Sequence, residues 1–113
     1  MSIQPKLCEI IVTGAESVEA AFTISTSGLP LSWYSRKGAT IDEIASISAG
    51  LVGIARELHL FDTKSEAAMT FETEFGAMYL RTLDSESLLV LCLLKGYSFL
   101  TIHRLLREVL STV

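Results

Sequence analysis

The sequence predicts an α/β sandwich with the element order α-β-β-α-β-β-β-α: a five-stranded antiparallel sheet with helices on both faces. Three observations predict it. Apolar residues alternate with period two in segments joined by glycine-containing turns, and three other segments have helical periodicity. The stretch from Leu88 to Leu94 is apolar on both faces, so it requires cover above and below. The 113 residues fit a single domain, residues 1–113.

The N-terminal third predicts a helix followed by a hairpin. The helix runs from about Gln4 to Thr13, and Gly14 follows as a stop signal. Alternation from Val18 to Ser25 and from Leu29 to Tyr34 predicts two strands joined by a turn at Thr26-Ser27-Gly28. Pro30 lacks an N–H group, which favours an edge position for the second strand.

The second predicted helix, from Ile41 to Leu60, has two distinct faces. Thr40 and Glu43 have the spacing of a capping box at its start. One face forms an apolar stripe that we expect to pack on the core: Ile44, Ile47, Leu51, Ile54, Ala55 and Leu58. The opposite face carries small residues: Ser46, Ala49, Gly50 and Gly53. Because glycine costs a helix about 0.5–1 kcal/mol relative to alanine, this face indicates either close approach of another backbone or a tolerated surface.

The C-terminal half predicts three strands and a helix. The strands run from Glu66 to Thr73, from Ala77 to Leu83 and from Leu88 to Leu94, with turns between them. The last of these is the expected central strand. From Ser98 to Val113, apolar residues recur on one helical stripe.

Composition excludes several classes of partner. The net charge of −4 argues against nucleic acid. The longest apolar run has seven residues, too short for membrane insertion. Cys8 and Cys92 are far apart, without metal-type spacing, and no signal-peptide pattern is present, so we expect unpaired thiols in a cytoplasmic protein. The mean hydropathy of +0.45 is high for a soluble monomer and favours surface hidden in an oligomer or complex.

No motif indicates catalysis. His59 and His103 lie on separate helices without a neighbouring nucleophile or acid, and no GxSxG, HExxH or P-loop pattern occurs. We therefore expect no enzyme activity, no catalytic residues, no metal and no cofactor. Arg36 is an alternative as an arginine finger for GTP hydrolysis, although an Arg-Lys pair beside a glycine more often marks a solvated loop. A small-molecule sensor would need a polar-lined pocket, and the sequence shows no such cluster.

The second strand of the first hairpin begins with Gly28-Leu29-Pro30-Leu31, the small-residue helix follows, and the closing hairpin contains Tyr79-Leu80 and Leu88 to Val90. In these features, over about Leu7 to Leu110, the chain resembles the Roadblock family, named for a dynein light chain. Within that family it resembles the short prokaryotic domains that partner Ras-like GTPases. Family members often have an acidic residue before that glycine, where this chain has Ser27.

The resemblance implies a homodimer, or a heterodimer with a second Roadblock subunit, in which third strands pair into one sheet and second helices pack together. The interface residues it implies are Ser46, Ala49, Gly50, Gly53, Glu66, Ala68, Thr70, Phe71 and Glu72. A Ras-like small GTPase would bind the outer side of the second helix and the loop before it, through Arg36, Lys37, Ala49, Arg56 and Glu57. The implied function is a non-enzymatic dimeric scaffold that modulates the GTPase cycle. The alternative is a cargo or complex adaptor of dynein-light-chain type without a GTPase.

Overall fold

The structure, a computed structural model, describes residues 6–61, 68–74 and 76–111. Its elements follow the predicted order: α1 (Leu7–Gly14), β1 (Val18–Ser25), β2 (Pro30–Ser35), α2 (Ile41–Glu57), β3 (Ala68–Thr73), β4 (Gly76–Asp84), β5 (Ser87–Leu94) and α3 (Phe99–Leu110). The predicted fold class is confirmed.

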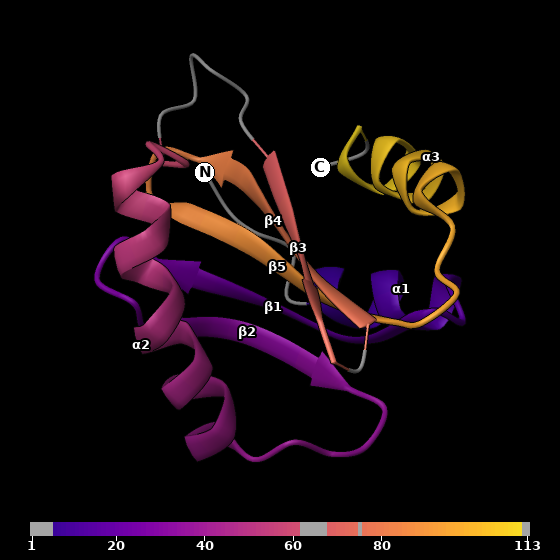
Figure 1. Ribbon diagram of the computed structural model, residues 1–113, viewed down its shortest axis with the longest axis horizontal. Helices are drawn as coiled ribbons and strands as arrows, with labels where there is room; N and C mark the ends of the chain where they lie inside the picture. The colour runs from indigo at the N-terminus through magenta and orange to yellow at the C-terminus, as the bar shows by residue number, and fades with distance from the viewer. Residues whose placement is uncertain (1–5, 62–67, 75, 112–113) are drawn as a thin grey trace.

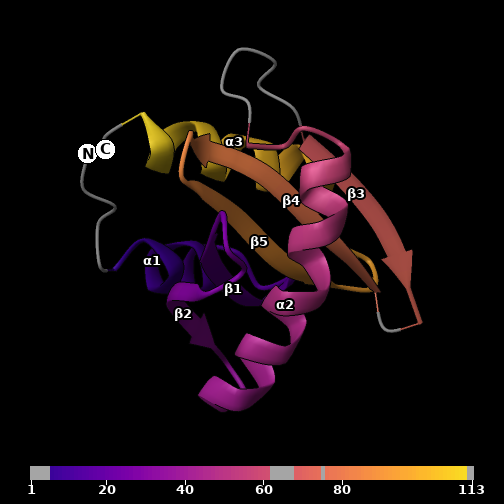
Figure 2. The same ribbon diagram turned by 90° about the vertical axis from the view of Figure 1, so that its left-hand side faces the viewer.

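The strands form one antiparallel five-stranded sheet in the order β2-β1-β5-β4-β3. The strand β5 is central, as its apolar sequence predicts, and every one of its residues from Leu88 to Leu91 is fully buried. The strand β2, which begins at Pro30, lies at one edge as expected, and β3 lies at the other edge (Figure 2).

Helices cover the two faces unequally (Figure 1). On one face, α1 and α3 pack on a core that includes Ile11, Leu91 and Ile102. On the other face, α2 is the one helix of the described residues that packs on a core that includes Phe22, Leu80 and Val90. A single helix therefore has to cover the sheet face that two helices cover on the opposite side.

The ends of α2 are set by local sequence. The predicted capping box is present: Glu43 N–H donates to Thr40 Oγ1 at 3.2 Å, and Thr40 N–H donates to Glu43 Oε1 at 3.1 Å. The helix ends at Glu57, earlier than the expected Leu60, because His59 adopts a left-handed conformation with φ of 56°. The N–H of His59 donates to the Arg56 carbonyl at 3.1 Å and that of Leu60 donates to the Ala55 carbonyl at 2.9 Å, which is a Schellman ending.

The turn between β1 and β2 contacts α2 through Gly28. This residue has φ of +87°, a conformation that favours glycine, and a Cβ there would lie 2.9 Å from Val52 Cγ1. Two features therefore favour glycine at the start of the Gly28-Leu29-Pro30 stretch: its backbone angle and the closeness of the helix beside it.

Candidate functional site

The outer surface of α2 carries large apolar side chains that the described chain covers only in part. Of the stripe predicted to face the core, Ile44, Leu51 and Ala55 are buried. The other three, here called the apolar row, are Ile47, Ile54 and Leu58, and they are 38%, 43% and 49% exposed. The prediction that the whole stripe packs on the core is wrong, because one helix on a sheet buries only a narrow part of its circumference.

The apolar row lies on one flank of α2. On the opposite flank, Val52 contacts the β1–β2 turn at Gly28, and Arg56 donates a hydrogen bond to the carbonyl of Thr26. At about 100° per residue, the apolar row is at least a third of a turn away from these contacts. The row is therefore free of the turn that holds the other flank.

The predicted small-residue face is also open. Ser46, Ala49, Gly50 and Gly53 are all exposed. A Cβ built on Gly50 or Gly53 would meet nothing within 4 Å, so no part of the described chain makes the close approach that these glycines permit. Such an approach would have to come from another molecule.

The strand β3 lies at the edge of the sheet, beside its half-covered part. Within the described residues it pairs with β4 alone, in a register that sets Thr70 opposite Tyr79 and Ala68 opposite Arg81. Met69 and Phe71 lie on the α2 side, where they are only half buried, and Met78 and Cys92 on the neighbouring strands are half buried on the same face. Of the predicted interface residues, Ala68, Thr70 and Glu72 lie on the α3 side by strand alternation, and Glu66 lies outside the described residues.

The charged residues predicted at a GTPase interface have different roles in the chain. Arg36 Nε donates to the Val18 carbonyl at 2.9 Å, and its Nη2 donates to the carbonyls of Ala15, at 3.0 Å, and Val12. Arg36 thereby satisfies carbonyls at the C-terminal end of α1 and the start of β1. Lys37 and Glu57 are exposed, and Arg56 ties α2 to the carbonyl of Thr26.

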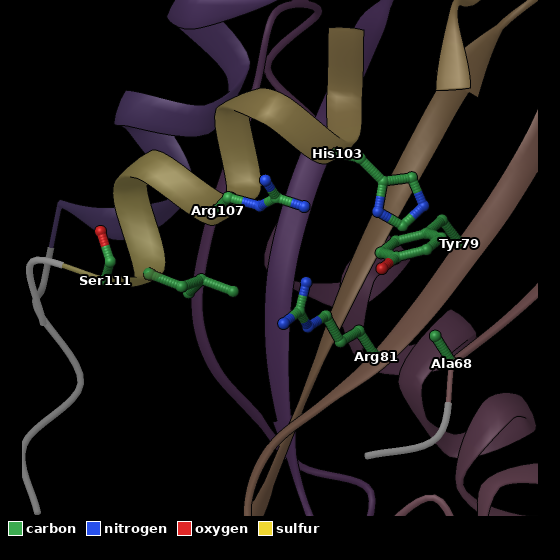
Figure 3. Close-up of a pocket in the computed structure, with 7 residues that line it drawn as sticks. Ala68, Tyr79, Arg81, His103, Arg107 and Ser111 are labelled. Atoms are coloured by element: carbon green, nitrogen blue, oxygen red, sulfur yellow. The ribbon is translucent and has the colours of Figure 1, made fainter. Parts of the chain in front are cut away.

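Polar side chains that are distant in sequence converge on the opposite face of the sheet (Figure 3). The hollow between α3 and the β3–β4 edge, here called the α3 hollow, has a volume of about 510 Å³. Its lining residues are Ala68, Tyr79, Arg81, His103, Arg107, Leu110 and Ser111. The sequence showed no polar cluster because these residues come from three separate elements.

Other kinds of site find no support in the described part of the chain. No group of three or more His, Cys, Asp or Glu residues there is placed to hold a metal ion. None of the described helices is long and apolar enough to cross a membrane. Cys8 and Cys92 are both free thiols.

One signal in the sequence could have identified the exposed row. Viewed down the axis of α2, apolar residues fill an arc that begins at Ile54, crosses the side facing the sheet and ends at Val52. This arc takes up about half of the circumference, whereas a helix on one sheet needs an apolar stripe of about 100°. An apolar arc of this width indicates a second contact surface.

Three solved structures are similar to this chain over nearly its whole length. The Roadblock/LC7 domain from Streptomyces avermitilis has a TM-score of 0.77 and 18% identity, and the match covers 100% of both chains. Myxococcus xanthus MglB has a TM-score of 0.75 and 14% identity, over 97% of this chain and 93% of that one. A structure described as MglB with tetrameric arrangement has a TM-score of 0.69 and 15% identity, over 99% of this chain and 89% of that one. No protein-family model matches the sequence, and no curated protein does. The predicted similarity of fold is confirmed.

Proposed function

We propose that this chain, which has the Roadblock/LC7 fold, is a non-enzymatic dimeric regulator that binds a Ras-like small GTPase and modulates its nucleotide cycle. The observation that carries the proposal is the exposed apolar row of α2 on the same side of the sheet as the half-buried Met69 and Phe71 of the free strand β3. Exposed apolar side chains gathered on one side of a domain are typical of interaction sites.

In the proposed dimer, the β3 strands of two copies pair antiparallel about a two-fold axis. In an antiparallel pair, directly opposite residues point to the same face of the sheet. An axis between two neighbouring residues would set those two opposite each other, although neighbours point to different faces. The axis must therefore pass through a residue position. Of the two central positions, Thr70 is favoured, because it sets Met69 opposite the partner's Phe71 and matches apolar side chains on the α2 side. With Phe71 on the axis, Met69 would instead lie opposite a threonine.

The same arrangement assigns the two flanks of α2 to different partners. The apolar row packs against the second copy, and Gly50 beside it permits close approach of the helices. Ala49, Gly53 and Arg56 then remain on the outer surface, where two copies of α2 form one platform for the GTPase. Lys37 and Glu57 supply charge at its rim, which mainly tunes the rate of encounter.

The comparisons and the resemblance support both halves of this proposal. One similar structure is described as a tetrameric arrangement, which is consistent with self-association of this fold. The resemblance to short prokaryotic Roadblock domains supports a Ras-like GTPase as the partner. The same resemblance and the absence of catalytic motifs in the sequence support the proposal that the chain is not an enzyme.

The test is light scattering of the purified protein with and without a Ras-like GTPase from the same organism, loaded with GDP or a GTP analogue. We expect a dimer alone and a larger complex with the GTP-loaded form. Ile54→Glu should produce monomers, because it sets a charge in the apolar row. The matched control is Leu100→Glu on α3, which is 63% exposed on the other face of the sheet and should leave the dimer intact.

The outcomes distinguish the two functions left open by the sequence. A monomeric mass for the unmodified protein at micromolar concentration would contradict the dimer. A dimer that binds no GTPase in either nucleotide state would favour the cargo or complex adaptor.

A further inference from the structure

The α3 hollow gathers positive charge that the described chain does not neutralise. Arg81 extends from β4 and Arg107 from α3, and Figure 3 shows both guanidinium groups directed into the space between the two elements. Neither guanidinium has a hydrogen bond or an ion pair with another described residue. Arg36 and Arg56, by contrast, are bonded to backbone carbonyls.

No carboxylate of the described residues is placed to neutralise this pair. The nearest acidic residue on the same face of β3 is Glu72, which pairs with Ala77, whereas Arg81 pairs with Ala68. Four strand positions separate the two register pairs, or about 13 Å along the strand. An isolated pair of like charges is unfavourable, so an anion that binds between the arginines would relieve a repulsion already present.

Aromatic side chains form the wall beside the two arginines. Tyr79 is only 2% exposed, and Figure 3 shows its hydroxyl directed toward the guanidinium groups. The ring of His103 contacts Tyr79 edge-on with centroids 6.0 Å apart, and it stacks on Phe99 with centroids 5.1 Å apart. These ring contacts fix the phenol and the imidazole, so the wall of the hollow is formed before any ligand arrives.

We propose that the α3 hollow is a binding site for a small phosphomonoester. Guanidinium forks match the oxygens of phosphate, and two of them balance a dianion, whereas a single carboxylate would use only one fork. The hydroxyl group of Tyr79 adds a neutral donor at the same hollow, whereas that of Ser111 already donates to the Glu108 carbonyl at 3.0 Å. The volume of about 510 Å³ is within the range of small-molecule sites and exceeds the needs of a bare anion, and Leu110 and Ala68 supply apolar lining for the organic part. This site lies on the opposite face of the sheet from α2 and needs no GTPase, but Ala68 of β3 lines it, so the proposed β3 pairing would bring a carboxylate of the second copy to its edge.

The test is calorimetric titration of the full chain with phenyl phosphate, inorganic phosphate and phenol. We expect phenyl phosphate to bind with one site per chain, inorganic phosphate to bind more weakly, and phenol not to bind. Arg81→Gln and Arg107→Gln should each weaken phenyl phosphate binding about tenfold or more, as expected for loss of a charge-assisted pair. The matched control is Arg104→Gln, which removes the same charge from an exposed position of α3 outside the hollow and should leave the affinity unchanged.

Thermal melting of the unliganded variants separates binding from a structural role. The Arg81→Gln, Arg107→Gln double variant should melt at the same temperature as the unmodified protein or higher, because it removes repulsion. The proposal is overturned if phenyl phosphate does not bind at millimolar concentration or binds the double variant equally well. It is also overturned if the two substitutions weaken association of two copies and leave phenyl phosphate binding unchanged, since the charges would then pair with the partner's β3 carboxylates.

Discussion

Substitution of Thr70 by cysteine should convert the proposed dimer into a covalent one. With Thr70 on the two-fold axis, the two copies of this residue are directly opposite each other. Opposite residues in an antiparallel pair have Cα atoms about 4.5 or 5.5 Å apart, and both distances fall within the range that a disulfide spans. Thr70 is half buried on a free edge strand, so the substitution should leave the fold intact.

Glu72→Cys is the matched control, because it lies two residues further along the same face of β3. In the Thr70-centred register, each Glu72 is opposite the partner's Ala68, which is four positions from the partner's Glu72. Four residues of strand amount to about 13 Å, and with the spacing between strands the two Cα atoms are about 14 Å apart. That separation is about twice the limit for a disulfide.

The assay is mild oxidation at pH 8 followed by non-reducing gel electrophoresis. The native thiols should interfere little. Burial, with the nearby Glu19 carboxylate, raises the pKa of Cys92 to about 11 from the ordinary 9.0, and burial raises the pKa of Cys8. A pKa two units above the ordinary value lowers the fraction of reactive thiolate at pH 8 about a hundredfold.

The expected result is a covalent dimer for Thr70→Cys and a monomer band for Glu72→Cys. A covalent dimer for Phe71→Cys but not for Thr70→Cys would show that the axis passes through Phe71. That result would refute the argument from matched apolar pairs. Equal cross-linking at Thr70 and Glu72 would indicate random collision and would remove the support for β3 pairing.

Further substitutions test other parts of the structure. Ala49→Glu should weaken binding of the GTP-loaded GTPase without changing the mass of the dimer, as measured by titration and light scattering; unchanged affinity would exclude Ala49 from the interface. Arg36→Ala should lower the free energy of unfolding by about 2 kcal/mol in a urea titration, because charge-assisted bonds to carbonyls at the end of α1 are lost. If Arg36→Ala instead abolished GTP hydrolysis while the fold and binding persisted, Arg36 would be a catalytic finger. His59→Gly should raise the unfolding free energy by about 1 kcal/mol, since φ of 56° is strained for histidine, and a decrease would contradict the role of this conformation at the end of α2. Gly53→Ala should stabilise the chain by about 0.5–1 kcal/mol if its Cβ meets open space as in the single chain, whereas weaker association would show that a partner needs the glycine.

Short-range patterns in the sequence were sufficient to predict the element order and the central strand. Thr40 and Glu43 are three residues apart, so their capping box needs no information beyond one helical turn. The apolar run from Leu88 to Leu91 requires cover on both faces wherever it lies, and the central position of β5 follows from that requirement. The interface residues implied by the resemblance, such as Ala49 and Thr70, stay predictions.

Which apolar residues stay exposed was decided only by the tertiary structure. Leu51 and Ile54 have the same hydrophobic character and lie about one helical turn apart, yet Leu51 is buried and Ile54 is 43% exposed. The difference arises because α2 meets the sheet along a single line of contact, and its direction depends on side chains from β1, β4 and β5. The α3 hollow depends even more on the tertiary structure. Arg81 and Arg107 are 26 positions apart in the sequence, and strand pairing and helix packing bring them together. Periodicity records how residues within one element relate to each other, whereas a site between elements depends on how those elements pack.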